Sequence, residues 1–131
     1  MRLKTVLIVS WLTLAGAIAL VMRSHQQGNP DPLSGIWTGD WGTTPTHRHS
    51  VTLELKWEGK TVTGTVNPGP HGIRVADGRF DVRASAVHLE IDASSMGRAI
   101  HYVVNGIVEN RTMIGTWRNE KNRGNFRLMK K

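Results

Sequence analysis

The chain has 131 residues, with no cysteine, five tryptophans, fourteen glycines and a formal net charge of +7. The absence of cysteine excludes disulfide bonds and thiol chemistry, so packing and hydrogen bonding must hold the fold together. Lysine and arginine are scattered singly along the chain instead of forming a cluster, and this argues against a nucleic-acid partner.

The first 22 residues are expected to direct the chain into a membrane. Arg2 and Lys4 precede 18 residues without charge, 5–22, and Arg23 follows them. The basic start, the apolar run and small residues in A-x-A spacing are typical of a signal peptide. As a helix the run would span roughly 27 Å, which suits a membrane anchor. We therefore expect residues 1–22 to be either a signal peptide or an N-terminal membrane anchor.

The apolar run is longer than in most signal peptides, and this slightly favours a retained anchor. Either alternative makes the rest of the chain extracytoplasmic. It would be held at the membrane through residues 5–22 if the leader stays, and periplasmic or secreted if the leader is cleaved. Residues 23–33 include Pro30 and Pro32 and are expected to form a flexible connector. Residues 34–131 then match the size of one domain.

From residue 34 onward, apolar and polar residues alternate with a period of two, which predicts β-strands with one buried face. The clearest stretch is 50–57, in which every second residue is apolar. A change of register between Val75 and Phe80 predicts a β-bulge near Asp77 and Gly78. The expected strands are 35–42, 50–57, 60–67, 73–80, 86–92, 98–109, 112–118 and 123–129. Eight short strands joined by brief turns predict an all-β fold, an antiparallel up-and-down barrel that closes on itself.

Large aromatic residues are expected on the inner face of this barrel. Trp37 and Trp41 lie four residues apart in the first strand, so they point to the same side. Gly64 and Gly115 occupy equivalent inward positions in two similar segments and would make room for bulky neighbours. Trp37 is expected to close one end of the barrel.

Two short motifs carry a resemblance to a known family. Gly35-Ile36-Trp37 opens the first strand, and Gly115-Thr116-Trp117 precedes Gly124-Asn125-Phe126-Arg127 in the last two strands. These features resemble the lipocalin-like, calycin-type barrels, in particular small exported bacterial domains. The resemblance implies that Trp37 lies at the barrel floor beneath a basic side chain, either Arg127 or Arg118. The chain is shorter than a typical lipocalin and lacks the biotin-binding residues of avidins, so the resemblance implies no particular ligand.

Aromatic residues are the candidate binding residues, and two functions from different classes follow from them. Small eight-stranded barrels are either filled by side chains or hold one small ligand, and the short chain favours a filled core. An open interior would make the protein a binding module for a small apolar or amphiphilic molecule. A filled interior would make it an interaction domain that contacts another envelope protein, as inhibitor or scaffold. The candidate ligand-binding residues, which could equally form the core, are Trp37, Trp41, Trp57, Tyr102 and Trp117.

Metal binding and catalysis are not expected from the sequence. His47 and His49 form an H-x-H pair without a third ligand nearby, and a zinc site needs three or four. His88 and His101 are expected to be neighbours on adjacent strands, in ordinary solvent-facing contacts. The sequence contains no phosphate-binding loop, nucleophile elbow or acyl-transfer triad. We therefore expect neither an enzyme nor a cofactor.

Overall fold

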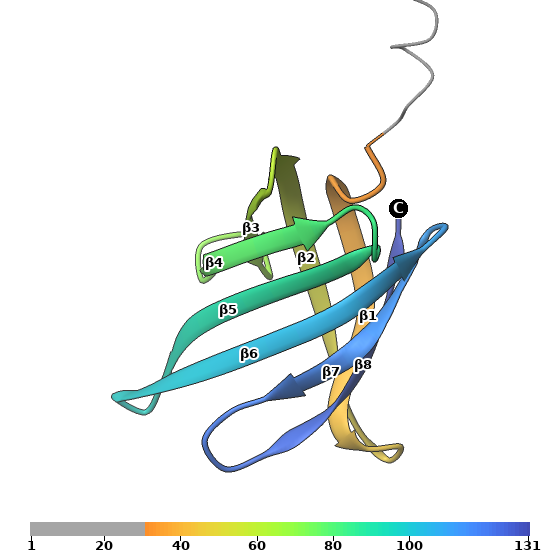
Figure 1. Ribbon diagram of the computed structural model, residues 1–131. Helices are drawn as coiled ribbons and strands as arrows, with labels where there is room; N and C mark the ends of the chain where they lie inside the picture. The colour runs from red at the N-terminus through yellow and green to blue at the C-terminus, as the bar shows by residue number, and fades with distance from the viewer. Residues whose placement is uncertain (1–30) are drawn as a thin grey trace, which may run out of the picture. The chain divides into compact units, whose positions relative to one another are not determined.

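The computed structural model describes residues 31–131, which form a closed barrel of eight antiparallel strands (Figure 1). Each strand pairs with the next, and β8 pairs with β1. The strands are β1 (Gly35–Thr44), β2 (His47–Glu58), β3 (Thr61–Val66), β4 (Ile73–Asp81), β5 (Ala86–Ser95), β6 (Arg98–Glu109), β7 (Thr112–Arg118) and β8 (Arg123–Lys130). The predicted all-β, up-and-down barrel is therefore confirmed.

The predicted leader, residues 1–22, and most of the predicted connector lie outside the described residues. Within residues 31–131 no helix has the length and apolar character needed to cross a membrane. Leu33 was assigned to the connector, yet its side chain is completely buried in the barrel. The packed unit extends from Pro32 to Lys131.

The hairpin between β5 and β6 is longer than the sequence predicts. Met96 and Gly97 both adopt positive φ angles, 51° and 79°, and they alone form the turn. Two-residue turns of this kind match the twist of the flanking strands. The small residues Ala93, Ser94 and Ser95, which looked like part of the turn, continue the ladder instead.

The bulge in β4 lies one step earlier than predicted. Val75 pairs with Ile91, but Asp77 pairs with Glu90, so the extra residue lies between Val75 and Asp77. Under simple alternation Asp77 would share the inner face with Val75. The bulge turns Asp77 outward, where it is exposed beside Glu90 on β5.

One end of the barrel is closed by the N-terminal segment. The side chains of Leu33 and Trp37 are completely buried, and the indole Nε1 of Trp37 donates a hydrogen bond of 2.8 Å to the Leu33 carbonyl. Trp57 and Phe80 pack edge to face there, with ring centroids 5.0 Å apart. The main core cluster also includes Leu53, Leu55, Val62, Val87, Leu89, Val108, Met113, Phe126 and Leu128.

Facing glycines allow a large ring to lie across two neighbouring strands. Gly106 on β6 is opposite Gly115 on β7, and Gly115 is opposite Phe126 on β8. A Cβ atom at Gly106 would lie only 2.9 Å from the Phe126 ring, and one at Gly115 would lie 2.6 Å from the Gly106 Cα. Both distances are shorter than atoms in a packed core tolerate, so glycine is required at these positions.

The basic residue expected over Trp37 is neither Arg127 nor Arg118. The inward positions of β8 are taken by Phe126 and Leu128, so Arg127 faces solvent. Arg118 pairs with Arg123 beside the β7–β8 turn, far along the ladder from Trp37. The residue opposite Trp37 on β8 is Lys130. The implication drawn from the resemblance was therefore wrong for both arginines.

Truncation of Trp37 tests whether the closed end stabilises the fold. Trp37→Ala should lower the free energy of unfolding by about 3–5 kcal/mol, because a completely buried side chain is lost. Trp37→Phe keeps most of the packing but removes the indole hydrogen bond to the Leu33 carbonyl, so a smaller loss of about 1–3 kcal/mol is expected. Chemical denaturation measures both values. An unchanged midpoint in Trp37→Ala would contradict this role.

Candidate functional site

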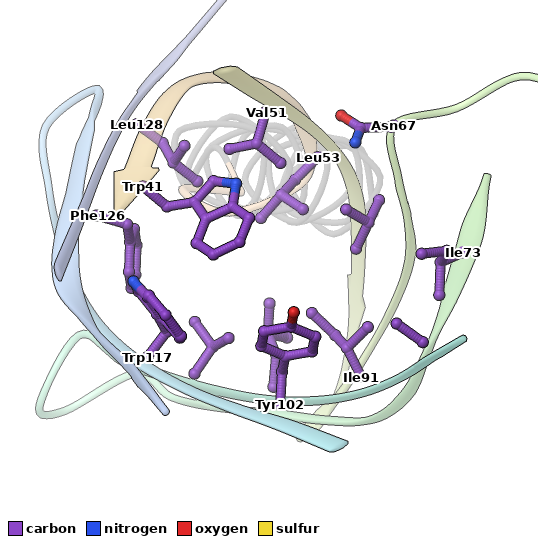
Figure 2. A pocket seen from close by; sticks show the side chains of 14 residues that line it. Trp41, Val51, Leu53, Asn67, Ile73, Ile91, Tyr102, Trp117, Phe126 and Leu128 are labelled. Atoms are coloured by element: carbon purple, nitrogen blue, oxygen red, sulfur yellow. The ribbon is translucent and has the colours of Figure 1, made fainter. Parts of the chain in front are cut away.

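A cavity of about 200 Å³ lies inside the barrel, at the end away from Leu33 and Trp37 (Figure 2). The turns β1–β2, β3–β4, β5–β6 and β7–β8 surround this end, because consecutive strands run in opposite directions. We call it the mouth of the barrel. The aliphatic wall of the cavity includes Val51, Leu53, Leu89, Ile91, Val104 and Leu128. The interior is thus filled at one end and hollow at the other.

Three aromatic side chains meet at the mouth. The rings of Trp41 and Trp117 lie edge to face, with centroids 4.9 Å apart and an interplanar angle of 87°. Tyr102 lies 6.1 Å from Trp41 and 6.0 Å from Trp117. Figure 2 shows Trp41 and Tyr102 projecting toward each other from opposite parts of the ring of strands. Edge-to-face contacts of this kind give the cavity a firm aromatic wall.

Several polar groups of the cavity wall remain available to a ligand. The Trp117 Nε1 donates to the Gly42 carbonyl at 3.3 Å, but within residues 31–131 neither the Trp41 Nε1 nor the Tyr102 hydroxyl has a hydrogen-bond partner. The Oδ1 of Asn67 accepts from the backbone N–H of Thr52 at 3.0 Å, which leaves its NH₂ group at the mouth. All three of these groups can donate a hydrogen bond.

The structure divides the five predicted binding residues into two groups. Trp41, Tyr102 and Trp117 line the cavity. Trp37 is buried at the closed end, and Trp57 packs on Phe80 and donates to the Gly59 carbonyl at 2.6 Å.

Phe126 and Asn67 also line the cavity and are not among the predicted binding residues. Phe126 lies in one of the motifs that carry the resemblance, and its inward position follows from the alternation with Leu128. Asn67 was placed in a strand end, and nothing in its sequence context indicated that its side chain would cap the Thr52 backbone.

A second group of polar residues lies on the outer face of β5 and β6. His88 Nε2 is 3.2 Å from Glu90 Oε2, and His101 Nε2 is 3.0 Å from Glu90 Oε1. The other ring nitrogen of each histidine also has a partner, because His88 Nδ1 lies 2.7 Å from Asn105 Oδ1 and His101 Nδ1 lies 2.6 Å from Asp92 Oδ1. We call these five residues the outer histidine cluster. The predicted proximity of His88 and His101 is therefore confirmed.

The carboxylates and imidazoles of this cluster change each other's acidity. Hydrogen bonding to Asp92, and then to Glu90, raises the pKa of His101 above its ordinary value of 6.5. Hydrogen bonding from His88, and then from His101, lowers the pKa of Glu90 below its ordinary value of 4.5. Both effects favour the charged forms, so the cluster is an ionic network at mildly acidic pH.

His47 and His49 have separate surroundings. His47 Nδ1 lies 3.0 Å from the Thr44 hydroxyl, and the His49 ring lies 5.0 Å from the Trp41 ring. Arg48, between them, forms an ion pair of 2.7 Å with Asp40. In the part of the chain that the structure describes, neither histidine belongs to a group of three metal-binding side chains.

Comparison with known proteins adds no family assignment, since no family model matches the chain and no curated protein matches it significantly.

The pKa changes predict how the outer histidine cluster contributes to stability. The raised pKa of His101 gives a contribution to the stability of the fold. This contribution is complete below pH 6.5 and is lost as the pH rises through the folded-state pKa of His101. The lowered pKa of Glu90 gives a second contribution to stability. This contribution is complete above pH 4.5 and is lost as the pH falls through the folded-state pKa of Glu90. The two contributions overlap between pH 4.5 and 6.5.

His101→Gln should therefore destabilise the protein most between pH 4.5 and 6.5. The difference in stability from the original chain should shrink as the pH rises above 6.5 and through the raised pKa of His101. Thermal unfolding in buffer that contains EDTA measures this difference. His71→Gln, in the exposed β3–β4 loop, is the control and should show no such trend. A difference for His101→Gln that does not vary with pH would contradict the assignment.

Proposed function

We propose that the chain is a lipocalin-like binding module, exported or membrane-anchored, that holds one small and largely apolar molecule in the mouth of its barrel. The cavity of about 200 Å³ carries this proposal, since it is apolar, lies next to Trp41 and Tyr102, and offers unused hydrogen-bond donors. Ligand sites in other proteins combine the same features, an apolar wall and a few well-placed polar groups.

The size of the cavity limits the ligand. A cavity of about 150 Å³ lined by leucine, isoleucine and phenylalanine stays dry and binds benzene. Sites for drug-sized molecules measure about 300–1,000 Å³. The present cavity of about 200 Å³ therefore suits a single ring with a short substituent, or a short alkyl chain. A longer amphiphile would leave most of its length outside the barrel.

The polar groups specify the other property of the ligand. Trp41 and Asn67 can only donate from their free N–H groups, and the Tyr102 hydroxyl can donate as well. A carbonyl, ether or carboxylate oxygen on the ligand would accept from them. Such a hydrogen bond contributes about 0.5–1.5 kcal/mol, so burial of apolar surface would provide most of the affinity.

The proposed role is binding without catalysis. Tyr102 is the one residue with a titratable side chain among those that line the cavity. General acid–base catalysis commonly uses histidine or carboxylate side chains placed against the reacting group, and the cavity wall contains neither.

An interaction domain is the second candidate function, and it is favoured by an apolar pair on the outer face. Ile107 and Ile114 are paired across β6 and β7, and 47% and 53% of their surfaces are exposed. Met129, on β8, is also 53% exposed. Such side chains could contact another envelope protein. The hollow mouth gives the binding function the stronger support, because an interaction domain has no need of a cavity.

A matched pair of ligands and a matched pair of variants test the binding function. Acetophenone should bind saturably to the full chain in isothermal titration calorimetry. Ala93→Phe adds a ring to the cavity wall and should weaken binding by about tenfold or more. Ala99→Phe makes the same change at an exposed position of the same hairpin and should bind normally. Absence of saturable binding, or equal weakening by both variants, would count against the proposed site.

Removal of one hydroxyl tests the polar part of the site. α-Methylstyrene has the shape of acetophenone but no carbonyl oxygen. Tyr102→Phe should weaken acetophenone binding by roughly threefold to tenfold, the equivalent of one hydrogen bond, and leave α-methylstyrene binding unchanged. Equal effects on both ligands would mean that the hydroxyl does not contact the carbonyl.

A further inference from the structure

The outer histidine cluster lies beside a third carboxylate, that of Asp77 on β4. The metal-binding atoms of Asp77, His88 and Glu90 all lie within 4.8 Å of one another. His101 lies next to this group, with its Nε2 3.0 Å from Glu90 Oε1. We propose that these four side chains form a binding site for a divalent transition-metal ion of the zinc type, distinct from the cavity inside the barrel.

The donor set has the composition that zinc prefers. Zinc in proteins is bound by imidazole nitrogen and carboxylate oxygen, usually by four donors in a tetrahedron. Calcium and magnesium prefer oxygen donors alone, so two imidazoles favour a transition metal. His88 and His101 supply the nitrogens, and Asp77 and Glu90 supply the oxygens.

The backbone holds the four residues in fixed register. Asp77 pairs with Glu90 across β4 and β5, and His101 pairs with Asp92 across β5 and β6. The bulge before Asp77 is what brings its carboxylate to the outer face, and bulges commonly redirect a side chain in this way beside functional sites. Val103 on β6 pairs with Glu90, and only 8% of its surface is exposed. It places a buried apolar side chain beside the cluster.

Each histidine is oriented as metal-bound histidines are. Metal ligands of this type usually donate their second N–H to a carboxylate or carbonyl oxygen, which fixes the ring. His101 Nδ1 meets the Asp92 carboxylate at 2.6 Å, and His88 Nδ1 meets the Asn105 side-chain oxygen at 2.7 Å. Both Nε2 atoms therefore remain directed at Glu90.

Two carboxylates lie together at this point of the outer face. Asp77 pairs with Glu90, and the metal-binding oxygens of the two side chains are within 4.8 Å of each other. Carboxylates this close repel each other, and a divalent cation bound between them would offset that repulsion.

Binding would need only small side-chain movements. Four ligands at zinc-bond lengths of 2.0–2.2 Å lie about 3.3 Å apart in a tetrahedron. Among Asp77, His88 and Glu90, the present separations of up to 4.8 Å must therefore close by roughly 1.5 Å, which partly exposed side chains achieve by rotation. Arg79 opposes binding, since its Nη2 is 3.8 Å from Asp77 Oδ2. Its side chain is 66% exposed and can swing into solvent.

Titration of the untagged full chain with zinc chloride at about pH 7.5 tests the proposal by calorimetry. We expect saturable binding of one ion per chain and a thermal midpoint that rises with zinc concentration. His88→Gln and Glu90→Gln should each weaken binding by about tenfold or more. The double variant His47→Gln/His49→Gln should bind as the original chain does.

One variant is expected to bind zinc more tightly, a result that misfolding cannot produce. Arg79→Gln removes the positive charge next to Asp77, so zinc should bind about threefold to tenfold more tightly. Thermal unfolding in EDTA checks that every variant is folded. Absence of saturable binding by the original chain would overturn the proposal. So would binding that is lost in the His47→Gln/His49→Gln variant but kept in His88→Gln.

Discussion

Closure of the strand ladder is the constraint on which the other features depend. Because β8 pairs with β1, every strand has one face toward the interior and one toward solvent. The inner face receives the large apolar residues, and the outer face receives nearly all the charges. The proposed ligand cavity and the proposed metal site therefore lie on opposite faces of the same sheet. Leu89 lines the cavity, while its neighbours His88 and Glu90 belong to the outer histidine cluster.

Asymmetric filling of the interior gives the barrel its hollow end. Trp37 and Leu33 occupy the closed end, joined by the indole hydrogen bond to the Leu33 carbonyl. Close packing of buried side chains at this end stabilises the ring of strands. At the mouth, Trp41 and Tyr102 contact each other edge to face but leave a cavity below them. Filled core and open pocket, which seemed alternatives in the sequence, are combined in one molecule.

The face of the sheet that a residue occupies was predicted from the sequence more accurately than its position along the barrel axis. Alternation is a local signal, so the strands and the inward tryptophans could be read directly. Height along the axis depends on the stagger between strands, which no local pattern encodes. Trp37 and Trp41 share a face, yet only Trp41 reaches the cavity. Asp77 lies beside Glu90 only because of the bulge, and the position of that bulge was predicted to within a few residues.

The location of a bound ligand tests the central claim most directly. Intermolecular NOEs between acetophenone and the methyl groups of the full chain would report which face the ligand contacts. We predict NOEs to Leu89 and Val104, which line the cavity, and none to Met113 at the closed end. NOEs confined to Ile107 and Ile114 would contradict the account, because they would place the ligand on the outer face.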